Sequence, residues 1–209
     1  MKIYDWHIAP NPRRLHIYLA EKGIKVELIE VGQSDMTLAP WYKAKYPHAM
    51  VPMLELDDGT CIGEAMAIAR YFEEVQPDPP LMGADAREKA VVAMWEKRAN
   101  EEGMLPASEL FRNTHPAFAD RGLPGSADPI PQIEALRERA RARLGRFFRK
   151  FDERLGESEF VAGPRWTVAD ATALCAVDFA GWSDVGIPPG YRNLARWHEA
   201  VSARPSAKA

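Results

Sequence analysis

The first 31 residues strongly restrict how this chain can fold. Residues 2–6 (KIYDW) are short and β-rich, and residues 25–31 (KVELIEV) alternate between apolar and polar side chains, so each predicts a strand. Between them, Leu15 and Leu19 belong to an apolar stripe that predicts a helix, and Gly23 is a typical helix stop. A strand, a helix and a strand in this order predict a parallel, right-handed βαβ unit.

The start of that helix lies in the segment APNPRR (9–14). Asn11 suits the N-cap, and Pro12 suits the first helical position, where no N–H is needed. The donors expected in this turn are the Asn11 side-chain amide, its backbone N–H, and the N–H groups of Arg13 and Arg14. The turn is therefore expected to present hydrogen-bond donors to a ligand.

Residues 32–50 read as irregular chain, and the segment VPMLELDDGTCIG (51–63) then predicts two short strands joined by a hairpin turn. The segment EAMAIARYFEEV (64–75) predicts a helix. Three prolines and a glycine in QPDPPLMGAD (76–85) are the best linker signal in the chain. We therefore expect an α/β domain over residues 1–76, a linker over 77–85 and an all-helical domain over 86–209.

Four features of the predicted helical domain can be assigned to definite residues. A helix is expected over residues 86–104, a long loop over 113–131, and an amphipathic helix over 132–155. Thr167 and Asp170 form a T-x-x-D capping box, which predicts the start of another helix and has no catalytic role.

Composition excludes several classes of protein. The net charge of −3 gives no general attraction to nucleic acid or anionic membrane, and the basic run RERARARLGRFFRK reads as the solvated face of a core helix. No signal peptide and no stretch long enough to span a membrane is expected. The five histidines have no ligand spacing, so no metal site is expected, and Cys61 and Cys175 read as buried thiols in a reducing cytoplasm.

Two segments favour a bound ligand. Pro52 opens a strand after a long loop, so the Val51–Pro52 bond is either cis or a trans bond on an edge strand. A cis bond would turn the Val51 N–H and C=O outward, where a peptide-like ligand adds itself as a short strand. Glu64 begins a helix, where free N–H groups favour a carboxylate ligand, or where Glu64 merely complements its own helix dipole.

Taken together, these segments resemble the cytosolic glutathione S-transferase family. The resemblance rests on APNPRRLHIYLAEKGI, VPMLELDDGTCIGEAMAIARYFEE and WTVADATA, which follow one another in the family's order and cover nearly the whole chain. It implies an α/β thioredoxin-like N-terminal domain plus an all-α C-terminal domain. It also implies glutathione as co-substrate without a metal, a small-molecule electrophile as second substrate, a homodimer and a cytoplasmic location.

The resemblance also assigns roles to individual residues. Val51 is expected to pair with the cysteinyl backbone of glutathione, and Pro52 is expected to be cis. Glu64 and Ala65 are expected at the γ-glutamyl end, and His48 is a further glutathione-binding candidate. The first turn of the helix after the first strand is expected to face the sulfur.

Three positions depart from the family pattern. Ala9 stands where related classes carry a catalytic Ser, Ala65 stands where a Ser usually follows the helix-start Glu, and Met50 replaces a common Lys or Gln. The chain is therefore most similar to bacterial and fungal members that lack the usual catalytic hydroxyl. We assign Asn11 and the helix start to stabilising the thiolate.

The resemblance places the acceptor site along PASELFRNTHPAF. Ser108, Asn113 and His115 are polar groups of this segment that are candidates to reach the sulfur or a nearby water, or else serve only as cap and loop residues. The first hypothesis is a glutathione S-transferase acting on small electrophiles. The alternative is a non-catalytic glutathione-transferase-like binding or assembly module, and isomerase or dehalogenase chemistry with the same thiol also stays open.

Overall fold

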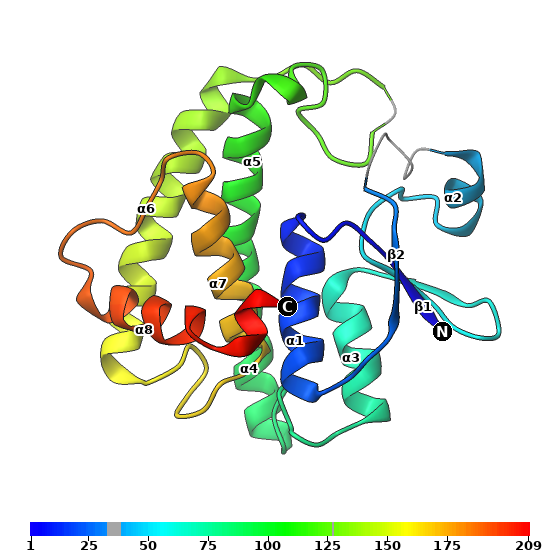
Figure 1. The fold of residues 1–209 in the computed structure, drawn as a ribbon. Coiled ribbons are helices and arrows are strands. Elements are labelled where there is room, and N and C mark those ends of the chain that lie inside the picture. Colours follow the sequence, from blue (N-terminus) through cyan, green and yellow to red (C-terminus); the bar gives the residue numbers. More distant parts are fainter. Residues whose placement is uncertain (33–38, 127) are drawn as a thin grey trace. The chain divides into compact units, whose positions relative to one another are not determined.

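The computed structural model describes residues 1–32, 39–126 and 128–209 (Figure 1). The chain forms two compact units, one of Met1–Pro80 together with Ala209, and one of Leu81–Lys208.

The first unit holds a four-stranded sheet and three helices. In chain order its elements are β1 (Lys2–Asp5), α1 (Pro10–Lys22), β2 (Glu27–Glu30), α2 (Pro40–Lys45), β3 (Met53–Glu55), β4 (Cys61–Gly63) and α3 (Ala65–Val75). The strand order is β2-β1-β3-β4. β1 pairs in parallel with β2, as the βαβ prediction requires, while β3 is antiparallel to both β1 and β4.

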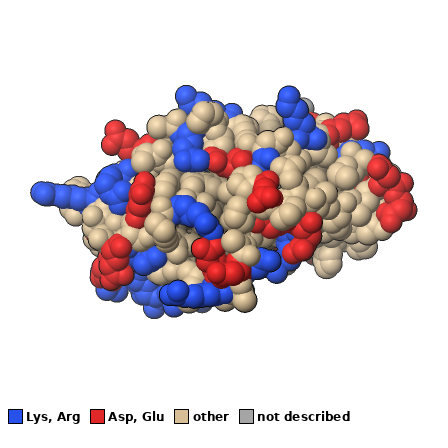
Figure 2. Space-filling model, turned by 90° about the horizontal axis from the view of Figure 1, so that it is seen from below, with Lys and Arg blue, Asp and Glu red and all other residues tan. Residues whose placement is uncertain are grey.

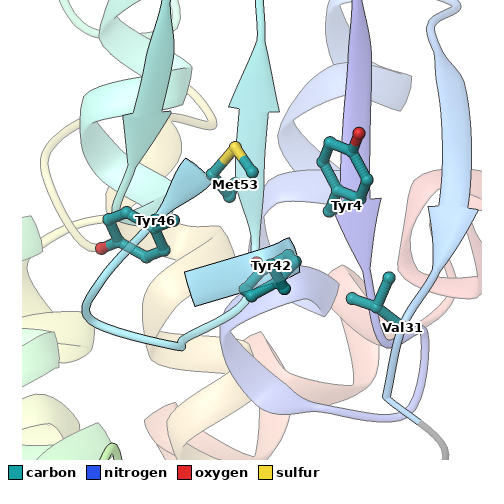
Figure 3. Packing of buried hydrophobic residues seen from close by; sticks show 5 residues of the cluster. All are labelled: Tyr4, Val31, Tyr42, Tyr46 and Met53. Atoms are coloured by element: carbon teal, nitrogen blue, oxygen red, sulfur yellow. The ribbon is translucent and has the colours of Figure 1, made fainter. Parts of the chain in front are cut away.

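Alternating side chains divide this sheet into two faces. One face carries a buried cluster of Tyr4, Val31, Tyr42, Tyr46 and Met53, against which α2 packs (Figure 3). Ile3 and Leu54, the strand neighbours of Tyr4 and Met53, are fully buried and point to the opposite face. The helices α1 and α3 lie side by side there (Figure 1). The sheet thus holds α1 and α3 on one side and α2 on the other.

The prediction of irregular chain over residues 32–50 is wrong where α2 forms; residues 33–38 of that segment lie outside the described part. α2 has only six residues, too few for an apolar stripe to appear in the sequence. Its stability comes from tertiary contacts instead. Tyr42 is fully buried, and its hydroxyl donates to the Met50 carbonyl oxygen at 2.6 Å.

The second unit is helical throughout its named elements. They are α4 (Ala86–Arg98), η2 (Ala99–Met104), α5 (Leu105–Thr114), η3 (Pro116–Phe118), α6 (Glu134–Glu157), α7 (Val168–Gly181), α8 (Arg192–Ser202) and η4 (Pro205–Lys208). The helix expected to end at residue 104 instead continues to Thr114 through the π-helical stretch η2. Pro106 has no N–H and crowds the preceding turn, and the wider π-helical turns just before it accommodate this proline.

The capping box forms as predicted and organises more than one helix. Asp170 is fully buried, and its carboxylate accepts hydrogen bonds at 2.9 Å from the N–H groups of Thr167 and Val161 and from Nε1 of Trp197. Burial raises the pKa of Asp170 to about 6, although the hydrogen bonds it accepts act to lower it. This single carboxylate joins the start of α7 to the preceding loop and to α8.

The basic run lies on α6, whose apolar side is buried through Leu144, Phe147 and Phe151. Several of its cations face acidic groups: Lys150 Nζ lies 2.9 Å from Glu102 Oε2, for example. Basic and acidic side chains are interspersed over the face drawn in Figure 2. No helix in the described residues is long and apolar enough to cross a bilayer.

Candidate functional site

The sheet register brings the predicted ligand-binding segments of the first unit to one edge. Met53 opens β3 opposite Tyr4, near the carboxyl end of β1, and Gly63 closes β4 opposite Met53. Pro52 and Glu64, the next residues outward, therefore lie at the same edge. Both α1 and α3 begin there as well. Ligands in α/β sheets are typically bound at such an edge, beyond the carboxyl ends of parallel strands.

At the start of α1, the prediction that Asn11 is the N-cap is wrong. The N-cap is Ala9, in an extended conformation with φ −77° and ψ 141°, and the helix begins at Pro10. The carbonyl oxygen of Ala9 accepts from the Arg13 N–H at 3.0 Å. Both Pro10 and Pro12 have the fixed φ that suits a first turn. The earlier proline starts the helix and places Asn11 at its second position.

This geometry leaves few donors at the helix start. Pro10 and Pro12 have no N–H, and the Arg13 N–H that was expected to be available is bonded to Ala9. The backbone donor that remains in the first three positions is the Asn11 N–H. Neither this N–H nor the Asn11 side chain makes a hydrogen bond within the described part of the chain. Asn11 thus presents both a backbone and a side-chain donor.

The Val51–Pro52 peptide bond is cis, which decides between the two alternatives that the sequence left open. Among the described residues, the Val51 N–H and C=O take part in no backbone hydrogen bond. The bond from Tyr42 to the carbonyl of Met50 fixes the chain just before them. The Val51 backbone is therefore held in place with one donor and one acceptor unused.

The helix predicted over 64–75 forms as α3, which begins one residue later at Ala65, with Glu64 as its N-cap. The Glu64 backbone has φ 66° and ψ 118°, which is rare for a residue other than glycine and is often found at ligand sites. Its side chain is exposed and makes no capping bond. Its carbonyl oxygen accepts from Ala67 and Ile68, so the N–H groups of Ala65 and Met66 remain directed at the helix start.

His48 lies near the same end of α3. Its exposed ring stands 5.3 Å from the ring of Tyr46, measured between centroids. The Tyr46 hydroxyl packs so closely on Gly63 that a side-chain carbon there would lie 2.1 Å away. Burial and the negative charge of Glu64 raise the pKa of Tyr46. Tyr46 thus links His48 to the residues around Glu64.

Three candidates belong to the second unit instead. Ser108 is half-buried on α5. Asn113 is buried and has a structural role, because it donates to the Glu109 carbonyl at 2.7 Å and accepts from the Ile133 N–H at 2.8 Å. His115 ends α5, and its Nδ1 accepts from the Ala117 N–H at 3.3 Å. The candidates that the structure brings together at the sheet edge are those of the first unit.

The sequence did not indicate one further pair at this edge. His7 Nδ1 lies 3.0 Å from Glu30 Oε2, and the Gly32 N–H donates to Glu30 Oε1 at 3.1 Å. Partial burial acts to raise the pKa of Glu30, but the hydrogen bonds from His7 and Gly32 lower it overall. His7 and Glu30 are 23 positions apart, so only the pairing of β1 with β2 brings them together.

No group of three His, Cys, Asp or Glu side chains suited to a metal ion occurs among the residues with defined positions.

Comparison with known proteins identifies the family. The family model described as "Glutathione S-transferase, N-terminal domain" matches residues 8–75, and "Glutathione S-transferase, C-terminal domain" matches residues 108–205. The chain belongs to the glutathione S-transferase family. The predictions of this family, of a glutathione transferase enzyme, and of a thioredoxin-like domain followed by an all-α domain are confirmed.

Relatives match along the whole chain. Glutathione S-transferase 2 of Saccharomyces cerevisiae is 34% identical over 218 residues, covering 100% of this chain and 88% of the relative. A glutathione S-transferase domain-containing protein of Marinobacter aquaeolei VT8 is 38% identical, with a TM-score of 0.89 over 99% of this chain and 100% of the other. The structure of Gtt2 from Saccharomyces cerevisiae is 32% identical, with a TM-score of 0.90 over 100% and 99%.

Proposed function

We propose that this glutathione transferase conjugates glutathione to small electrophiles in the cytoplasm, as a homodimer, with the thiolate held at the start of α1. The observation that carries the proposal is the meeting of three features at one sheet edge. These are the start of α1 with Asn11, the cis Val51–Pro52 bond and the start of α3 at Glu64.

Each feature suits a different part of glutathione. The N–H groups of Ala65 and Met66 face outward at a helix start, where the γ-glutamyl carboxylate would be favoured. The Glu64 carboxylate would accept from the γ-glutamyl amino group. The unused N–H and C=O of Val51 would pair with the cysteinyl backbone in the manner of an added strand. His48, exposed beside Tyr46, is the further glutathione contact that we propose.

Asn11 would activate the sulfur without a Ser or Tyr. A hydrogen bond to a charged group contributes about 1.5–3 kcal/mol, and the helix end contributes about 0.3–1 kcal/mol. At about 1.36 kcal/mol per pKa unit, together they would lower a thiol pKa by roughly 1–3 units from about 8.5. Pro10 and Pro12 remove two N–H groups from the turn. The Asn11 side chain would therefore contribute more to stabilising the thiolate than the backbone N–H groups that remain at this helix start.

The bound thiolate would attack the electrophilic carbon of the second substrate, forming a C–S bond as the leaving group departs. Ser108 and His115 are the residues that we propose along the acceptor side. The non-catalytic alternative has less support, because glutathione S-transferase 2 of Saccharomyces cerevisiae, which matches this chain along its whole length, is called a transferase.

The proposal is tested with a panel of electrophiles and glutathione, read against the uncatalysed rate of each pair. Aryl halides, enones and haloalkanes should be included, with halide release measured for the last class to detect dehalogenation and a cis enone to detect isomerisation. We expect conjugation above the uncatalysed rate with at least one class. Glutathione binding without acceleration of any reaction would favour the binding module instead.

A further inference from the structure

The His7–Glu30 pair at the sheet edge has the geometry of an oriented base. Glu30 stands at the carboxyl end of β2, opposite Asp5 at the end of β1. Its Oε2 lies 3.0 Å from His7 Nδ1 and also faces the His7 backbone N–H at 3.4 Å. A carboxylate in this position favours the tautomer with the proton on Nδ1, which leaves the Nε2 lone pair as an acceptor.

The ring of His7 remains accessible. Its side chain is 66% exposed, and the hydrogen bond recorded for the ring uses Nδ1 alone within the described residues. The charged group that these residues place against the ring is Glu30. Asp5, the nearest other carboxylate along β1, is buried and faces His16 Nε2 at 3.2 Å instead.

The position of His7 follows from the turn that leads into α1. The Ala9 N–H donates to the Trp6 carbonyl oxygen at 2.8 Å, which closes a tight turn around His7. Asn11, at the second position of α1, follows directly. His7 therefore lies in the short connection between β1 and α1, and Asn11 lies in the first turn of α1 directly after it.

The strand order determines which part of glutathione this connection would meet. Across the edge, Glu64 follows β4, Val51 precedes β3, and His7 follows β1, with Glu30 on β2 beyond it. A glutathione anchored at Glu64 and paired with Val51 would direct its cysteinyl side chain toward the end of β1. The group that reaches this connection is then the thiol.

We propose that His7, oriented by Glu30, is the base that removes the thiol proton of bound glutathione. This inference rests on the proposed function and deepens it. The S–H bond breaks, its proton moves to His7 Nε2, and the electron pair stays on sulfur. The imidazolium is stabilised by the Glu30 carboxylate, and the thiolate by Asn11. In a substitution, the proton is later released to water; in an addition to an enone, Nε2 returns it to the carbon next to the carbonyl.

The test compares wild type, His7→Gln, Glu30→Gln and the control His198→Gln. His198 also faces a carboxylate, with Nε2 2.7 Å from Asp178 Oδ1, but in the second unit. Two quantities are measured against pH: the ultraviolet thiolate absorbance of bound glutathione, and kcat/KM with one electrophile. Binding of S-methylglutathione, which has no thiol proton, is measured separately, and circular dichroism checks the fold of each variant.

We expect His7→Gln to lower the thiolate fraction and kcat/KM about tenfold or more near neutral pH, because general bases typically contribute about 10²–10⁴-fold and a thiol needs less help than most groups. The loss should shrink as the pH rises past the ordinary thiol pKa of about 8.5, while S-methylglutathione binding stays within about twofold of wild type. Glu30→Gln should show a smaller loss of the same form, and His198→Gln none.

An active wild type with a His7→Gln variant that titrates identically would overturn the assignment of His7 and leave the proposed function standing. A loss that is equal at every pH would do the same, because it would show a structural role. A wild type that does not bind glutathione would overturn both proposals. If His7→Gln does not fold, His7→Ala with added imidazole replaces it; return of activity near neutral pH supports the base, and no return contradicts it.

Discussion

Lys22 Nζ lies 2.7 Å from Glu73 Oε2, and their side chains are 0% and 8% exposed. The ammonium group also donates to the carbonyl oxygens of Gln76 and Pro79, both at 2.6 Å. The Tyr18 hydroxyl donates to the same Glu73 oxygen at 2.5 Å. Burial and the hydrogen bond to Glu73 raise the pKa of Tyr18. This network joins α1 to α3 and to the segment that ends the first unit.

Replacing Lys22 with Met should destabilise the protein by about 3–5 kcal/mol, the usual cost of removing one partner from a buried ion pair. Glu73 would lose its ammonium partner and keep the hydrogen bond from Tyr18. The free energy of unfolding in urea measures the effect. The double variant Lys22→Met, Glu73→Met should recover much of the lost stability. A double variant whose loss equals the sum of the losses of the two single variants would contradict this account.

Replacing Glu64 with Ala should weaken glutathione binding by roughly 1.5–3 kcal/mol, the range for a hydrogen bond to a charged group. Calorimetry gives the affinity directly. Glu74→Ala is the matched control, since Glu74 is an exposed residue near the other end of α3. Equal affinities for the two variants would remove Glu64 from the site.

Replacing Asn11 with Ala should raise the pKa of the bound thiol by about 1–2 units, through loss of a donor to the thiolate. Because Ala9 rather than Asn11 caps α1, the free energy of unfolding should stay within about 0.5 kcal/mol of wild type. Asn11→Asp should raise the thiol pKa further by placing a carboxylate against the sulfur. Thiolate absorbance against pH tests these expectations, and three identical titrations would exclude Asn11.

Asp170 should make stability depend on pH. Its pKa of about 6 in the folded protein lies above the ordinary 3.8, so between these values the folded state binds more protons than the unfolded state. The contribution of this group to stability is therefore largest below about pH 4, and about 3 kcal/mol of it is lost as the pH rises through 6. Unfolding of wild type and Asp170→Asn at both ends of this range measures it.

As the pH rises from about 4 through 6, the wild type should lose about 3 kcal/mol of stability relative to Asp170→Asn, because an amide does not titrate. Asp170→Asn should still be the less stable protein at neutral pH, since its NH₂ group would face the donors of Thr167, Val161 and Trp197. A constant difference between the two proteins across the range would contradict a titrating Asp170.

Light scattering should give a particle of twice the 23.4 kDa chain mass at micromolar concentration. This expectation comes from the family alone. A mass of one chain would contradict the proposed homodimer.

Features with a local signal were predictable from the sequence. Gly23 ends α1 with φ 67°, a conformation that suits glycine best. Pro52 follows a loop and directly precedes β3, and Thr167 and Asp170 are separated by the spacing of a capping box. In each case neighbouring residues are sufficient to indicate where an element begins or ends.

Features that depend on distant contacts were not predictable. The bonds of Asn113 reach Ile133 across 20 positions, and His7 meets Glu30 only through strand register. The sequence predicts a start of α1 two residues too late, because Pro10 and Pro12 both satisfy the same local rule. Only the hydrogen bond from Arg13 to Ala9 distinguishes them.

The two prolines at the start of α1 also affect how much disorder the turn can have. Each ring fixes φ of its own residue near the helical value, and Pro10 also favours the extended backbone that Ala9 adopts before it. This part of the chain therefore has few alternative conformations to give up, either when the protein folds or when a ligand arrives. A ligand bound at this turn gains from a surface already in its final shape, because no loop has to be ordered around it.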